Sequence, residues 1–159
     1  MTMSKLQHEL KKKRPFESLE QEAALGVVRT SDQLQIRFAR LLREHGLTPS
    51  QYNVLRILRG EGEPLPILEI ASRTITVVPG ITGLIDRLEQ AGFVNRVRCE
   101  KDRRVIYVAL TAQATQTLAV LDEPMAALHQ NLLGHLSKAE LMELIRLLEK
   151  VRAPLTADD

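Results

Sequence analysis

The segment Val78–Val94 has the sequence VPGITGLIDRLEQAGFV, and it is the most informative part of the chain. Apolar side chains recur in it at spacings of three and four, at Ile81, Leu84, Ile85 and Leu88. This period predicts an amphipathic helix over Val78–Ala91 that packs one face on the protein and stops at Gly92. The opposite face carries few large apolar side chains and is therefore available for another task.

Two strand-like runs follow this helix, Phe93–Arg98 and Val105–Leu110, and together they predict a β-hairpin with a polar tip. Before the helix, Ile67–Arg73 has the pattern of a short helix, and a turn around Thr74–Thr76 separates the two. Two short helices joined by a tight turn and followed by a hairpin form the layout of a winged helix-turn-helix.

A strong helix start lies further upstream, at Thr48–Gln51. Thr48 is a suitable N-cap, Pro49 suits the first helical position, and Gln51 completes a capping box. Pro64-Leu65-Pro66 then forces an extended connection. We therefore expect residues 47–110 to form one winged helix-turn-helix lobe, mainly α-helical with a small β-hairpin.

Long helices flank this lobe in the sequence. Helical patterns extend over Glu17–His45 and from Thr111 to about His135, where Pro124 should kink or break the helix near Asp122. A second capping box, at Ser137–Glu140, begins a final helix with one apolar face. The fold class that follows is mainly α-helical, with a hairpin inserted between helices from both ends of the chain.

The first 15 residues are polar and end in the basic run Lys11-Lys12-Lys13-Arg14 before Pro15. A flexible, solvated basic arm is one interpretation of this segment. An arm that contacts DNA backbone or a partner subunit is the other. Residues 154–159 form a short tail after the last helix.

The composition excludes several classes of protein. The chain has 159 residues, 44% of them hydrophobic, and a net charge of only +2. The net charge alone does not indicate a nucleic-acid partner, so only the distribution of charge along the chain can do so. Aromatic residues are 3% of the chain, which disfavours a single-stranded nucleic-acid site built on base stacking. One cysteine rules out an internal disulfide framework and a multi-cysteine zinc site. With no signal peptide or bilayer-length apolar run, we expect a cytoplasmic protein with no membrane contact.

The outer face of the helix over Val78–Ala91 is suited to a DNA groove. Gly80 and Gly83 each cost about 1 kcal/mol relative to alanine in a helix interior. For Gly83, central on the outer face, we expect close approach to DNA. For Gly80, close approach to DNA remains open beside a structural interpretation, which is tight packing within the protein or simple tolerance near the helix N-terminus. Thr82, Arg87 and Gln90 are candidate hydrogen-bonding side chains, although Gln90 lies far along the helix and Arg87 is also suited to a structural ion pair.

Apolar groups at the start of this helix, on Val78, Pro79 and the methyl of Thr82, are suited to contact thymine methyl groups. We therefore expect specificity to come from apolar contacts and DNA shape as well as from hydrogen bonds. Asp86 would repel phosphates, so we expect it to pair with a neighbouring arginine or accept a bond inside the protein.

The hairpin is the most basic part of the folded region. Its basic residues are Arg96, Arg98, Lys101, Arg103 and Arg104. An arginine at such a tip can enter a narrow minor groove. Asp102 is placed to orient an arginine through a charge-assisted fork.

Two blocks of sequence resemble the MarR (multiple antibiotic resistance regulator) family of bacterial transcription factors. Leu84–Val94 resembles the family's recognition helix and its exit into the wing, and Asp102-Arg103-Arg104 with the later Ala109-Leu110-Thr111 resembles its wing signature. The resemblance covers roughly Leu34 to Leu148. The chain departs from the family pattern at Val77, Val78 and Gly80, where serine and threonine are common.

The resemblance implies a homodimer that binds double-stranded DNA at a pseudo-palindromic operator and acts in transcription regulation, most simply as a repressor in the bacterial or archaeal nucleoid. Residues 16–46 and 111–153 would form the dimerisation region, and their apolar stripes would be largely uncovered in one subunit. The recognition helices would occupy successive major grooves and the wings the flanking minor grooves. The DNA-binding residues expected from the pattern and the resemblance together are Val78, Pro79, Gly80, Thr82, Gly83, Arg87, Lys101, Asp102, Arg103 and Arg104.

Many members of the family respond to small aromatic or anionic effectors bound near the dimerisation helices. Phe38, Leu42, Tyr52 and Leu55 are the candidate pocket residues, and a plain core role is the alternative for each. Cys99, near the wing tip, is open to a redox role or to none. The four histidines show no metal-ligand spacing, and no cofactor or metal is expected.

Two other classes of function remain to be weighed. A winged-helix protein–protein adaptor without DNA binding would have no need to keep both an arginine-rich wing and an open outer helix face. An enzyme would need a nucleophile–base constellation, a glycine-rich phosphate loop, paired carboxylates or a metal motif, and the sequence contains none of these. We therefore do not expect an enzyme.

Overall fold

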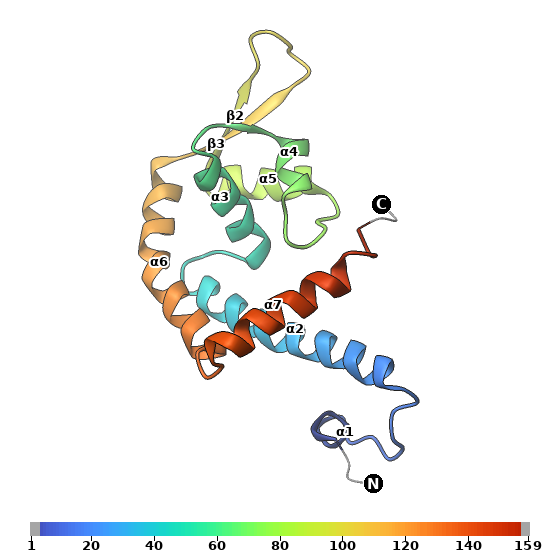
Figure 1. Cartoon of the computed structure of the whole chain (residues 1–159). Coiled ribbons are helices and arrows are strands. Elements are labelled where there is room, and N and C mark those ends of the chain that lie inside the picture. The colour runs from blue at the N-terminus through green and yellow to red at the C-terminus, as the bar shows by residue number, and fades with distance from the viewer. Residues whose placement is uncertain (1–3, 157–159) are drawn as a thin grey trace.

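The computed structural model describes residues 4–156, which form a mainly helical chain with a small antiparallel sheet (Figure 1). Its helices are α1 (Lys5–Glu9), α2 (Leu19–Arg43), α3 (Pro49–Glu61), α4 (Ile67–Ser72), α5 (Ile81–Gln90), α6 (Ala112–Leu133) and α7 (Lys138–Arg152). Its strands are β1 (Leu65–Pro66), β2 (Val94–Arg98) and β3 (Ile106–Leu110). Figure 1 shows α3, α4, α5 and the hairpin gathered at one end, with α2 and α7 extending away from them. This is the winged helix-turn-helix with flanking helices that the sequence predicts.

Side-chain caps fix where the longer helices begin. The Thr48 hydroxyl accepts from the backbone N–H of Gln51 at 3.2 Å, while the Gln51 side chain accepts from the Thr48 N–H at 2.9 Å. Ser137 and Glu140 form the same reciprocal pair at the start of α7. Both predicted capping boxes are therefore confirmed.

The sheet has one strand more than the predicted hairpin. β2 and β3 pair antiparallel from Val94↔Leu110 to Arg98↔Ile106, and β1 adds to the other side of β3 with Leu65 opposite Val108. Pro66 is tolerated in β1 because β1 is an edge strand, where a missing N–H breaks no ladder. The extended connection expected at Pro64–Pro66 thus becomes a paired strand.

The recognition helix α5 is shorter than predicted, since it begins at Ile81 and not at Val78. Gly80 is its N-cap residue, and its φ of +70° lies in the left-handed region that side-chain-bearing residues avoid. The turn before the helix therefore ends with a residue whose backbone favours glycine. Neither interpretation offered for Gly80 from the sequence, close approach or tight packing, is needed to explain it.

The proline in α6 does not break the helix. α6 is continuous over Ala112–Leu133 with Pro124 inside it, so the expectation of a break near Asp122 is wrong. Figure 1 shows α6 as a bent helix, which agrees with the expected kink. Leu121 and Met125 on either side of the proline are buried, and this packing offsets the missing backbone hydrogen bond.

One hydrophobic core lies inside the winged lobe and against α6. Its largest fully buried side chains are Leu42, Val54, Leu55, Ile70, Ile85, Leu88, Val94, Val108, Leu118 and Leu121. The two long flanking helices contribute little to it, because α2 buries only Leu42 and α7 buries no residue. A single chain therefore leaves the apolar faces of α2 and α7 without a complete cover.

The N-terminal segment has local structure where the sequence suggested a flexible arm. Ser4 caps the short helix α1, and the buried side chain of Gln7 donates to the carbonyl of Lys12 at 3.3 Å. The side chain of Leu6 lies close to Gly26 of α2. Residues 1–3 of the predicted arm and 157–159 of the predicted tail lie outside the described residues.

Candidate DNA-binding surface

Helix α5 presents the two faces that its sequence predicts. Leu84, Ile85 and Leu88 are buried in the core, whereas Thr82 and Arg87 are exposed on the other side. The side chain of Arg87 makes no ion pair within residues 4–156. It is therefore free to bind an anion, and the structural ion pair considered for it from the sequence is absent.

The three residues that precede α5 differ in how available they are. Pro79 and Gly80 are exposed, whereas Val78 is half-buried and packs against the core. Val78 therefore helps to anchor the start of the recognition helix, and only part of its side chain remains open to a DNA base.

Gly83 lies in the first turn of α5 without a close neighbour that would require glycine. A Cβ added there would meet only Nη1 of Arg87, at 3.7 Å, which is an ordinary van der Waals contact. Tight packing inside the protein does not explain this glycine. Close approach to DNA remains a prediction, and the space beside Gly83 is compatible with it.

The candidate residues at the wing tip, Lys101, Asp102, Arg103 and Arg104, are all exposed, and so is the neighbouring Glu100. The carboxylate of Asp102 accepts from the backbone N–H of Arg104 at 3.0 Å, and the carbonyl of Asp102 accepts from Val105 N–H at 3.0 Å. Among the described residues, Asp102 makes no ion pair with an arginine side chain. The predicted Asp–Arg fork is therefore wrong for the free protein, because Asp102 uses its carboxylate to close the turn.

An ion-pair cluster joins the wing to the recognition helix. The guanidinium of Arg96, on β2, lies 2.5 Å from an oxygen of Asp86 and 2.6 Å from one of Glu89, both on α5. The backbone N–H of Arg96 also donates to Glu89 at 3.2 Å. The hydrogen bond to Asp86, and to a lesser extent the one to Glu89, raises the pKa of Arg96. The expectation that Asp86 pairs with a neighbouring arginine is confirmed, whereas the sequence did not indicate Glu89 as a partner.

A second cluster, also missed from the sequence, fixes the first helix of the helix-turn-helix. Arg73, just after α4, contacts Glu61 of α3 at 2.6 Å and Glu69 of α4 at 2.7 Å. Hydrogen bonds to Glu61 and then Glu69 raise the pKa of Arg73. The pair Glu69–Arg73 has the i, i+4 spacing that could have indicated it. The contact with Glu61 depends on how the helices pack.

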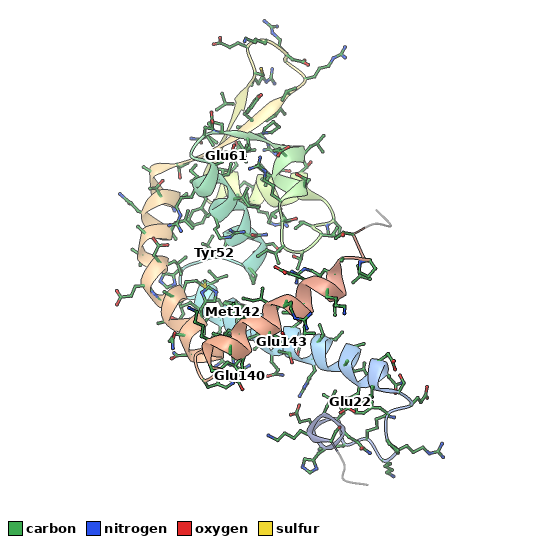
Figure 2. The ribbon with its side chains drawn as sticks, in the orientation of Figure 1. Glu22, Tyr52, Glu61, Glu140, Met142 and Glu143 are labelled. Carbon is green, nitrogen blue, oxygen red and sulfur yellow. The ribbon has the colours of Figure 1, made fainter. Side chains whose placement is uncertain are left out.

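The four candidate effector residues separate into two groups. Leu42 is 1% exposed and Leu55 is fully buried, so both take part in the core, which was the alternative role for each of them. Phe38 and Tyr52 are half-buried against that core, and the ring of Phe38 lies edge-on to His129 with centroids 5.4 Å apart. Figure 2 shows Tyr52 at the end of α3 nearest to α2. Only Phe38 and Tyr52 therefore keep a surface that a ligand can reach.

Cys99 is a free, half-buried thiol at the end of the wing strand β2, and it borders an open hollow with Arg98, Glu100 and Arg103. Across the part of the chain that the structure describes, no group of three metal-ligating side chains occurs. No helix in that part is long and apolar enough to cross a membrane.

The comparisons with known proteins agree with this geometry. The MarR family model matches residues 47–106, which extend from the start of α3 into β3. The chain is 25% identical over 146 residues to the transcriptional regulator FarR of Neisseria gonorrhoeae, covering 90% of this chain and 99% of FarR. It is 34% identical over 108 residues to the uncharacterized regulator YkoM of Bacillus subtilis, covering 68% of this chain and 70% of YkoM.

A solved structure gives a similar result. The crystal structure of a MarR transcription factor from Planctomyces limnophilus superposes with a TM-score of 0.65 at 44% identity, covering 84% of this chain and 98% of that one. The identity extends over nearly the whole relative, and the winged lobe matches the family model. The chain is therefore a member of a family of transcription regulators and not of an enzyme family. The chain belongs to the MarR family and is a DNA-binding transcriptional regulator.

Proposed function

We propose that this regulator acts as a homodimer on a pseudo-palindromic operator in double-stranded DNA, as a repressor that a small aromatic or anionic ligand releases. The observation that carries the proposal is the pairing of two surfaces. The outer face of α5 and the wing tip are both exposed, each carries arginine side chains with no ion pair among the described residues, and the Arg96 cluster joins α5 to the wing strand β2. A duplex with alternating grooves is the partner that needs both surfaces at once.

The dimer is supported by apolar surface that one chain leaves open. On α7, Met142 is 62% exposed and Ile145 is 55% exposed, and on α2 Val28 and Ile36 are also exposed. Figure 2 shows Met142 on α7, whose apolar side chains have too few partners in the single chain. A second copy would cover these faces and place two recognition helices on one duplex. Residues 16–46 and 111–153 form the proposed dimerisation region, and residues 47–110 the DNA-binding lobe.

The proposed DNA contacts divide by groove. The start of α5 would contact base edges in the major groove through Pro79, Gly80, Thr82, Gly83 and Arg87, with Val78 at its edge. The wing would contact the minor groove and its phosphates through Lys101, Arg103 and Arg104, with Asp102 shaping the tip.

Repression and an effector are supported by relatives. The chain is 25% identical over 113 residues to the homoprotocatechuate degradative operon repressor of Escherichia coli. Solved structures of similar fold include an organohalide-sensing regulator in a 2,4-dichlorophenol-bound form and Bordetella bronchiseptica BpsR, whose DNA binding is regulated by 6-hydroxynicotinic acid. For this chain we propose Phe38 and Tyr52 as ligand contacts. Binding of either compound, read as release of operator DNA, tests this part of the proposal.

The alternative of a protein–protein adaptor predicts different behaviour toward DNA. The decisive experiment is selection from a random duplex library, followed by titration of the best site against salt. We expect an inverted repeat and a steep dependence of log Kd on log salt concentration. In the variant Arg103→Ala/Arg104→Ala this slope should shrink by about one unit for each phosphate that the two arginines neutralise in the wild type.

A matched variant, Arg40→Ala/Arg43→Ala, removes the same charge from exposed positions on α2, away from the proposed DNA contacts. Because α2 belongs to the proposed dimerisation region, sedimentation first checks that this variant is still a dimer, and its slope should then be nearly unchanged. Failure to enrich any repeat, with binding that neither variant alters, would exclude operator recognition and favour the adaptor.

A further inference from the structure

Two large apolar side chains are almost fully exposed in the turn of the helix-turn-helix. Ile75 is 79% exposed and Val77 is 92% exposed, and both lie in the connection of residues 73–80 between α4 and α5. Figure 1 shows this connection as a loop that protrudes beyond the ends of the two helices. Single exposed apolar residues are ordinary on a protein surface, but these two occur within three residues and lead directly into the recognition helix.

Two polar side chains just before them, those of Arg73 and Thr74, already have partners inside the protein, whereas Thr76, which lies between the two apolar residues, is exposed. The side chain of Arg73 is held by Glu61 and Glu69, and the hydroxyl of Thr74 donates to the carbonyl of Ala71 at 3.0 Å. The Thr74 hydroxyl proton is used inside the protein, and the charge of Arg73 is balanced by two carboxylates, so both are poor phosphate ligands. Apart from Thr76, the loop therefore offers an apolar surface at the edge of the proposed DNA-binding face, next to the exposed Pro79.

One apolar group is accessible in the major groove of DNA, and it is the C5 methyl of a pyrimidine. Thymine carries this methyl beside its O4 acceptor, so a branched aliphatic side chain can distinguish it from the other bases by contact alone. Burying one methyl-sized group stabilises a contact by about 0.8 kcal/mol, which is about fourfold in Kd.

We propose that Ile75 and Val77 are specificity-determining residues that contact thymine methyl groups flanking the positions read by α5. The inference rests on the proposed function, since it needs α5 to lie in the major groove. DNA is the partner that this position indicates, because the loop leads directly into the N-terminal turn of α5. When Thr82 approaches a base edge, the loop comes close to the next base pairs. The operator is then enriched in T·A pairs at those positions.

The test is a double-mutant cycle between side chain and methyl group. The probe is the best duplex recovered from the random library, made once with thymine and once with deoxyuridine at the flanking positions of both half-sites. Deoxyuridine keeps every hydrogen-bonding group of thymine and lacks only the methyl. For the wild type we expect Kd to rise by about fourfold for each contacted methyl removed, or about 15-fold for one in each half-site.

The variants Ile75→Ser and Val77→Ser should bind the thymine duplex more weakly and should discriminate less between thymine and deoxyuridine. Leu155→Ser is the matched control, because Leu155 is an aliphatic residue with 65% exposure in the tail after α7, outside both the proposed DNA-binding surface and the proposed dimerisation region. It should discriminate as the wild type does. Thermal unfolding of all three variants checks that the fold is retained.

Three outcomes would overturn the inference. One is equal wild-type affinity for the thymine and deoxyuridine duplexes. Another is discrimination that persists undiminished in both serine variants, because the methyl would then be read by Val78, Pro79 or Thr82. The third is a specific loss of binding to a protein partner in these variants with DNA binding intact. Failure of the library to yield any site would instead exclude the proposed function.

Discussion

The guanidinium of Arg96 lies 2.5 Å from the carboxylate of Asp86, and this contact joins the wing to the recognition helix. Glu89 completes the cluster at 2.6 Å. The arginine side chain is mostly covered, whereas the two acids are partly exposed, so the cluster stabilises the fold only modestly. Because it connects β2 to α5 across the turn at Gly92, we expect its main effect to be on the orientation of the wing relative to the helix.

Arg96→Ala should therefore impair DNA binding more than folding. We expect a decrease of about 1 kcal/mol in the free energy of unfolding, and a rise in operator Kd of about tenfold, equivalent to about 1.4 kcal/mol. The operator affinity of Arg96→Lys should lie between those of the wild type and Arg96→Ala, because a lysine cannot contact both acids in the planar geometry of a guanidinium. Chemical denaturation and fluorescence anisotropy measure the two effects.

Removing both acids as well tests whether the loss of contacts or the unpaired charge causes the defect. The variant Asp86→Ala/Glu89→Ala/Arg96→Ala leaves neither carboxylate of the cluster unpaired near the phosphates, but it still lacks the connection between helix and wing. We expect it to bind as weakly as Arg96→Ala. Recovery of wild-type affinity in the triple variant would show that charge repulsion, and not wing position, causes the defect.

The wing tip provides a second prediction, about the role of Asp102. Because its carboxylate accepts from the N–H of Arg104, Asp102→Asn should preserve the turn and bind the operator about as well as wild type or better. Asp102→Ala removes the acceptor, so we expect weaker binding by several-fold and weaker protection of DNA by the wing in footprinting. Equal weakening in both variants would instead indicate that the negative charge itself is needed, as in an Asp–Arg fork formed only on DNA.

Much of the fold could be predicted from local sequence signals, namely the spacing of apolar residues and the helix caps. Period and capping located α3, α5 and α7, because the spacing of apolar residues and the pair Thr48–Gln51 act within a few residues. The MarR resemblance, carried by the recognition helix and the wing motif, is confirmed by the comparisons.

The remaining features depend on contacts between distant segments. Strand β1 exists only because β3, about forty residues later, offers an edge to pair with. The Arg96 cluster requires the chain to turn back at Gly92, which has a φ of +81°. Leu42 and Leu55 were candidate pocket residues because an apolar residue in a helix does not indicate whether another helix or a cavity lies beside it.

The two glycines at the start of α5 should respond to substitution in opposite ways. Gly80→Ala places a Cβ in the left-handed region, at φ +70°, and should destabilise the protein by about 1 kcal/mol, whereas Gly80→Asn should cost less. Gly83→Ala carries no such strain, so the unfolding free energy should stay constant or rise by up to about 1 kcal/mol. Gly83→Ala should nevertheless weaken operator binding if the helix backbone approaches DNA there.

Both glycine variants are measured for thermal stability and operator Kd in parallel. A Gly83→Ala protein with unchanged operator affinity would contradict close approach at that position. A Gly80→Ala protein as stable as wild type would contradict the left-handed backbone of the turn.

The capping box of α7 makes part of the stability dependent on pH. The backbone and side chain of Ser137 lower the pKa of Glu140 below its ordinary value of 4.5. A carboxyl whose pKa is depressed on folding stabilises the protein above its unfolded pKa, and this stabilisation is lost as the pH falls through the folded value. We therefore expect the melting temperature to decrease when the pH is lowered below about 4.5, and Glu140 should account for part of this decrease.

Glu140→Gln isolates this contribution, because glutamine can serve in a capping box, as Gln51 does, without titrating. The variant should show a smaller fall in melting temperature between neutral pH and about pH 3 than the wild type. The same acid sensitivity in both proteins would assign the effect to other carboxyls, such as Glu143, whose pKa is lowered by Arg146.

The exposed apolar face of α7 predicts that a single charge can separate the proposed dimer. Ile145 is 55% exposed in the single chain, and a glutamate there would be desolvated without a partner if a second copy covered it. We expect Ile145→Glu to sediment as a monomer at concentrations where the wild type is a dimer, and to lose operator affinity because one lobe contacts only one half-site. Leu68→Glu, at an exposed apolar residue of α4 outside the proposed dimerisation region, is the control and should remain dimeric. A dimeric Ile145→Glu protein with wild-type affinity would exclude this face of α7 from the interface.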